Sequence, residues 1–83
     1  MTNNAARIPP EHFSRELVTV MRVALEEAVA RIPPPNRTSA TKAKMAERIV
    51  RTASQGVVQA ERLVSVAIDE GNEPAALPDS ASH

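Results

Sequence analysis

Apolar and polar positions recur with a helical period over three stretches of this chain. In the longest stretch, about residues 10–32, apolar side chains return every three or four residues and share one face, while the opposite face is charged. This is the pattern of a helix with one buried side. Prolines at 9–10 and at 33–35 mark its two ends, since proline fits a first helical turn and cannot continue a helix. We therefore predict one long helix over residues 10–32.

Part of the apolar face of this helix has the alternating three- and four-residue spacing of a coiled-coil seam. The face is also wider than two short helices would cover, so we expect part of it to contact a second chain. A substitution such as Leu25→Glu is then expected to give unfolded or monomeric protein. The residues predicted to form this seam are Val18, Met21, Leu25 and Ile32.

A second helical stretch, about residues 40–55, follows the prolines. Thr38 and Ser39 precede it, and hydroxyl side chains at this position accept hydrogen bonds from the first amide groups of a helix. Gly56 follows it, and glycine is the residue that most often ends a helix, because it adopts a left-handed conformation without steric cost. We predict a helix that begins after one of these two hydroxyls and stops before Gly56.

The third helical stretch covers about residues 59–70 and ends at Gly71. No stretch alternates with the two-residue period of a strand, so the predicted fold is all-α. It consists of one long helix packed by two shorter ones, and we expect a dimeric helical bundle. The predicted organisation is a flexible N-terminal arm (1–8), a single helical domain (9–71) and a disordered tail (72–83) that has two prolines and no period.

The 83 residues include one aromatic side chain, Phe13, and no cysteine. Large apolar side chains supply most of the free energy that offsets the ordering of the chain, so a single copy of this chain is expected to be only marginally stable. Disulfides and cysteine zinc sites are excluded. We expect a homodimer, or a helical partner protein, to supply further buried surface.

Ten basic and ten acidic side chains cancel, so no long-range field favours nucleic acid or an anionic membrane. Residues 37–51 are nevertheless basic, with five cations against Glu47. Some of these cations lie where a helix begins and its amide groups point outward, so they are candidates for binding a phosphate ligand or nucleic acid. They are equally consistent with pairing to acidic residues of the third helix or of a second chain, or with a solvated polar loop. They are Arg37, Lys42, Lys44, Arg48 and Arg51.

The sequence predicts no catalytic, cofactor-binding or metal-binding residue. His12 lies four residues before Glu16, but two ligands without a third make a poor metal site. There is no glycine-rich phosphate loop. No apolar run approaches membrane-spanning length and the N-terminus lacks the apolar core of a signal peptide, so cytoplasmic residence without membrane contact is expected.

The segment from Arg37 to Gly56, preceded by the long helix, resembles a group of short uncharacterised all-helical proteins of soil alphaproteobacteria. The resemblance covers about residues 10–70. Members of that group often place aspartate and proline before the last helix, where this chain has Gln59 and Ala60, so the third helix is expected to have a weaker cap. The resemblance implies a bacterial cytosolic origin and no particular activity.

These observations favour a non-enzymatic protein–protein interaction module, a small adaptor or regulator that self-associates. The alternative is a protein that binds nucleic acid or a phosphate ligand through the basic second helix. The two differ in their response to salt, because a phosphate-backbone binder loses affinity steeply as salt rises, whereas an apolar docking surface does not.

Overall fold

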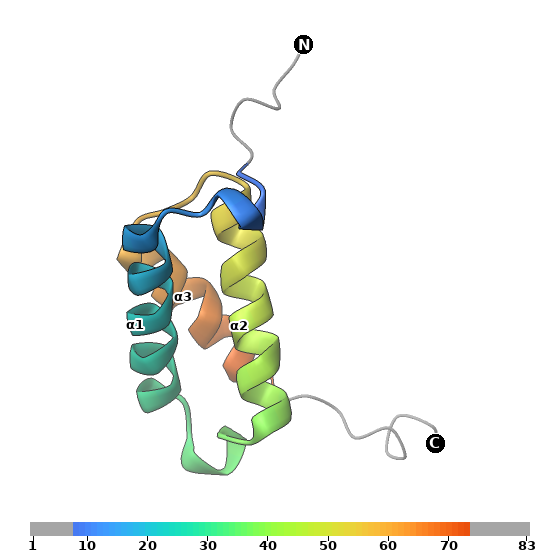
Figure 1. Cartoon of the computed structure of the whole chain (residues 1–83). Coiled ribbons are helices and arrows are strands. Elements are labelled where there is room, and N and C mark those ends of the chain that lie inside the picture. Colours follow the sequence, from blue (N-terminus) through green and yellow to red (C-terminus); the bar gives the residue numbers. More distant parts are fainter. Residues whose placement is uncertain (1–7, 74–83) are drawn as a thin grey trace.

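The computed structural model describes residues 8–73 of the chain, and within them every regular element is helical (Figure 1). The predicted all-α fold class is therefore confirmed. Residues 1–7 of the predicted arm and 74–83 of the predicted tail lie outside the described residues. The elements are η2 (Pro10–His12), α1 (Arg15–Arg31), η3 (Pro34–Asn36), α2 (Ser39–Ser54) and α3 (Ala60–Gly71).

The first helix begins later than the prolines indicated. Pro10–His12 forms a single 3-10 turn, closed by a hydrogen bond from the His12 amide to the Pro9 carbonyl oxygen at 2.8 Å. The chain is then extended, and Ser14 caps α1 by accepting a hydrogen bond from the Leu17 amide at 3.0 Å. The predicted start at residue 10 was wrong because a serine that satisfies an otherwise unpaired amide is a stronger start signal than a proline, which only tolerates the first turn.

The second helix agrees with the prediction at both ends. Thr38 is extended and its hydroxyl accepts a hydrogen bond from the Thr41 amide at 3.1 Å, so Thr38 is the cap and Ser39 is the first helical residue. At the other end, Gly56 has a φ angle of 97°, in the left-handed region, and its amide donates to the Ala53 carbonyl oxygen. The stop at Gly56 therefore rests on the conformation that favours glycine.

The third helix starts without a side-chain cap, since Gln59 makes no capping hydrogen bond. This confirms the weak start expected from the departure at Gln59 and Ala60. The helix ends at Gly71, and the Asn72 amide donates to the Ile68 carbonyl oxygen at 2.9 Å.

The packing centres on α3, not on the long helix. α3 packs against both α1 and α2, whereas α1 and α2 touch each other much less. Figure 1 shows α1 and α2 side by side, with α3 behind them. The prediction of a long helix covered by two shorter ones was wrong in this respect. The physical reason is that a larger fraction of the residues is buried in α3 than in α1 or α2. α3 can therefore pack against both neighbouring helices at once.

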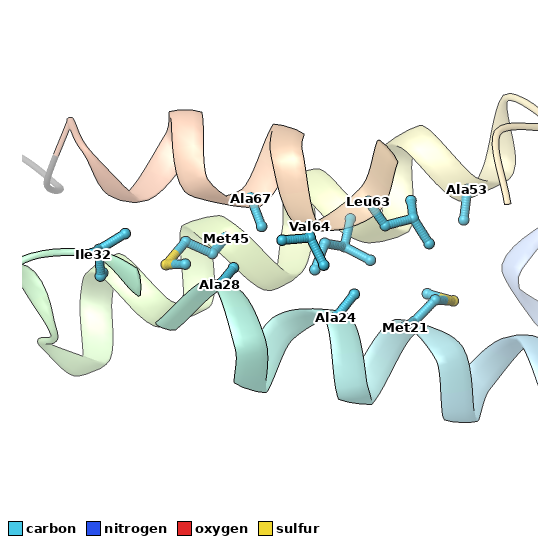
Figure 2. Packing of buried hydrophobic residues seen from close by; sticks show 10 residues of the cluster. Met21, Ala24, Ala28, Ile32, Met45, Ala53, Leu63, Val64 and Ala67 are labelled. Atoms are coloured by element: carbon cyan, nitrogen blue, oxygen red, sulfur yellow. The ribbon is translucent and has the colours of Figure 1, made fainter. Parts of the chain in front are cut away.

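The core between the helices is small. Figure 2 shows Met21, Ala24 and Ala28 of α1 on the side that faces α3, with Leu63, Val64 and Ala67 of α3 opposite them. Alanine side chains let the helix axes approach closely, but each buries little apolar area. Four of the ten buried hydrophobic residues are alanines: the ten are Met21, Ala24, Ala28, Ile32, Met45, Ile49, Ala53, Leu63, Val64 and Ala67.

Candidate functional site

An apolar groove runs between α1 and α2 on the side of the molecule that α3 does not cover. It forms because both helices pack on α3 and only weakly on each other. Its volume is about 210 Å³. One of its seven lining residues is charged, and the rest are apolar. We call this surface the α1–α2 groove, and its lining residues are Val18, Met21, Arg22, Leu25, Ala46, Ile49 and Val50.

The residues of the predicted seam divide between this groove and the core. Val18 is 39% exposed and Leu25 is half-buried, so both present apolar surface to solvent. Met21 is 9% exposed and Ile32 only 1%, and both belong to the chain's own core. In this structure Ile32 therefore has no surface to offer a second chain. Sequence spacing could not separate these roles, because it does not show where α3 covers α1.

Four of the seven lining residues are not among the site residues predicted from the sequence, namely Arg22, Ala46, Ile49 and Val50. Every fourth residue of α2 is buried, namely Thr41, Met45, Ile49 and Ala53. Ala46 and Val50 are only partly buried. Ala46 and Val50 lie beside that row, on the wall that faces α1.

The first of the five candidate cations, Arg37, turns back onto the end of α1. Its guanidinium donates to the carbonyl oxygens of Ala30 at 3.0 Å and Ile32 at 3.2 Å. The last carbonyl groups of a helix have no partner inside the helix and carry partial negative charge, so a cation there is favourable. Arg37 thus stabilises the connection between α1 and α2.

Lys44 and Arg48 both bind Glu70 of α3. The Lys44 Nζ lies 3.3 Å from Glu70 Oε2, and the Arg48 guanidinium lies 3.1 Å from Glu70 Oε1. Lys44 also donates to the Glu73 carbonyl oxygen at 3.3 Å. Pairing with the third helix was one of the alternatives that the sequence left open for these cations.

The remaining two cations, Lys42 and Arg51, are exposed on α2 and make no ion pair within residues 8–73. The structure therefore does not gather the five candidate cations into one cluster. Three of them are engaged by carbonyl or carboxylate oxygens of the chain itself.

Two other depressions are larger than the groove. One, of about 510 Å³, lies between α1 and α3 and has charged walls, among them Glu61 and the ion pair of Glu27 with Arg31. The other, of about 390 Å³, lies near the start of α1. Its lining combines the polar side chains of His12, Ser14 and Glu16 with four apolar ones, Ile8, Leu17, Val20 and Val58. We favour the α1–α2 groove as the candidate site in spite of its smaller volume, because both larger depressions are lined by more polar side chains, and polar side chains are costly to desolvate.

Within residues 8–73, no group of three or more His, Cys, Asp and Glu side chains is placed to hold a metal ion. In the same part of the chain, no helix combines the length and the apolar character that a membrane span requires. Comparisons with protein-family models, with curated proteins and with solved structures find no match to this chain.

Proposed function

We propose that this chain is a non-enzymatic protein–protein interaction module, a small adaptor or regulator, and that it self-associates through the α1–α2 groove. The observation that carries the proposal is the groove itself, an apolar surface bounded by two helices and left open by the third. A helix laid into such a groove would complete a four-helix arrangement, which is a common way for helical proteins to associate.

The composition of the core supports a second copy as the occupant. The buried cluster relies on four alanines and has no aromatic member, so the apolar area that a single copy buries is small for its length. Val18 and Leu25 remain accessible next to this core. If two copies paired across the groove, Val18 and Leu25 of both copies would be buried in the dimer.

Binding of nucleic acid or of a phosphate ligand has less support. It would need the cations of α2 to be available together, whereas Lys44 and Arg48 bind Glu70 and Arg37 binds the end of α1. No aromatic side chain accompanies them for stacking on bases. A binding measurement across a range of salt would reveal this function through a steep loss of affinity.

Sedimentation of the chain over a range of concentrations tests the proposal. We expect a dimer that dissociates on dilution, and we expect Val18→Glu to shift the chain to monomer, because a carboxylate in the groove must lose its hydration when two copies meet. Helicity measured by circular dichroism should be retained, since Val18 is 39% exposed and a glutamate there can remain solvated in the monomer.

Val23→Glu is the matched control. Val23 is a valine of the same helix, is 52% exposed and does not line the groove, so this variant should dimerise like the natural chain. A natural chain that is monomeric at all concentrations would contradict the proposal. So would a Val18→Glu variant that dimerises as well as Val23→Glu.

A further inference from the structure

Arg22 is the one charged residue that lines the α1–α2 groove. On α1 it interrupts an apolar row, with Val18 one turn before it and Leu25 and Val29 in the turns after it. Glu26 is one turn beyond Arg22 and directly follows Leu25. Glu26 does not line the groove, but together with Arg22 it places one negative and one positive charge on neighbouring turns of α1, between Val18 and Val29.

Arg22 and Glu26 form no ion pair with each other, nor with any other residue from 8 to 73, although they are four apart on one helix. Glu27 and Arg31, spaced identically on the other side of α1, do form one. The difference agrees with the order of the charges, because an acid that precedes a base by four residues pairs better than the reverse. Both Arg22 and Glu26 are exposed, so their charges are available to a partner that packs along α1.

The positions of these two charges distinguish the ways in which two copies of α1 can meet about a two-fold axis. In a parallel pair each residue faces its own equivalent, so Arg22 would lie against Arg22 and Glu26 against Glu26. In an antiparallel pair centred between Arg22 and Leu25, Val18 of one copy faces Val29 of the other. Arg22 of each copy then lies next to Glu26 of the other. Charge complementarity thus favours the antiparallel arrangement, while like charges oppose the parallel one.

We infer that two copies of this chain pack antiparallel along α1 across their grooves, with Arg22 of each copy paired with Glu26 of the other. The inference rests on the proposed self-association and specifies the orientation of the partner. Arg22 and Glu26 then determine specificity, because only a partner that presents the opposite charge at the opposing position fits.

Two charge-reversal variants, mixed together, test this arrangement. Arg22→Glu alone and Glu26→Arg alone each place like charges at both cross-pairs of the homodimer, so each homodimer should be weakened on the order of tenfold. In the mixture, a heterodimer of the two variants restores both cross-pairs. We expect its affinity to return to within a few-fold of the natural dimer, measured by sedimentation or by energy transfer between labelled chains.

Arg31→Glu mixed with Glu27→Arg is the control, because it changes charge by the same amount on the side of α1 that faces α3. This mixture should show no selective heterodimer. If the natural chain dimerises and the Arg22→Glu with Glu26→Arg mixture gains no more than the control mixture, the antiparallel pairing is wrong while self-association stands. If the natural chain is a monomer, both proposals fail.

Discussion

Gly71 lies at a point where all three helical segments meet. A Cβ atom at this position would lie 2.8 Å from the Met45 Sδ of α2 and 2.9 Å from the Cγ2 of Ile32, which follows α1. These distances are shorter than a normal contact between such atoms. Gly71 also accepts a hydrogen bond on its carbonyl oxygen from Asn36 Nδ2 at 3.0 Å. The sequence indicated Gly71 only as the end of a helix, whereas the structure shows that the absent side chain makes room for the core.

Gly71→Ala should therefore destabilise the chain, although alanine is the better helix former. Overpacking a closed core typically costs about 1–3 kcal/mol, and the gain in helix propensity offsets about 1 kcal/mol of this. We expect the free energy of unfolding to fall, by up to about 2 kcal/mol, in urea denaturation followed by circular dichroism.

The matched control for Gly71→Ala is Ser65→Ala, at an exposed position of the same helix. It should leave stability unchanged or raise it by up to about 0.5 kcal/mol, because it improves propensity without a steric conflict. A Gly71→Ala variant as stable as the natural chain would show that Met45 and Ile32 move aside at a cost no greater than the gain in helix propensity.

At the scale of elements, α2 and α3 compensate each other's unfavourable charges. α2 has no acidic residue in its first turn, and Lys42 and Lys44 lie close to that positive end of the helix dipole. α3 carries Glu70 in its last turn, next to the negative end of its own dipole. The two helices run antiparallel, so these ends are neighbours, and Glu70 binds Lys44 and Arg48. Charge placements that weaken each helix alone therefore help to fix their pairing.

Glu70→Gln should lower the free energy of unfolding by about 1 kcal/mol at low salt, because two ion pairs are lost together. The value is modest since the Lys44 and Arg48 side chains are 36% and 42% exposed and solvent screens the pairs. Denaturation in high salt should reduce the difference from the natural chain, because salt weakens exposed ion pairs.

Asp69→Asn removes the same charge from the same end of α3, at an exposed position that makes no ion pair within the described residues. It should change stability by less than about 0.5 kcal/mol at either salt concentration. Equal effects of Glu70→Gln and Asp69→Asn would mean that the contacts of Glu70 contribute nothing beyond the general charge of the helix.

At the scale of the whole molecule, the proposed dimer couples folding to concentration. If the folded state is a dimer and the unfolded state is not, mass action raises the melting temperature as the chain concentration rises. For a chain of this size, a hundredfold increase in concentration should raise Tm by roughly 5–10 °C. Calorimetry or circular dichroism at several concentrations measures this, and a Tm that stays constant over that range would indicate a monomer that folds alone.

Local patterns predicted much of the secondary structure because the interactions that end a helix lie within a few residues of each other. Thr38 and Gly56 were recognised as the limits of α2 because a hydroxyl cap and a left-handed glycine act on the adjacent backbone alone. The start of α1 was misjudged because Pro10 and Ser14 offer two local start signals in succession, and their relative strength depends on the hydrogen bond that only Ser14 accepts.

The sequence by itself determined an all-helical chain with three helices and few large apolar residues for its core. Only the tertiary structure decided that α3 is the central helix, that Ile32 belongs to the core while Val18 lies at the surface, and that Lys44 and Arg48 bind Glu70. The reason is physical. The period of a helix shows which side chains share a face, but which part of a wide face is covered depends on how distant helices pack against it.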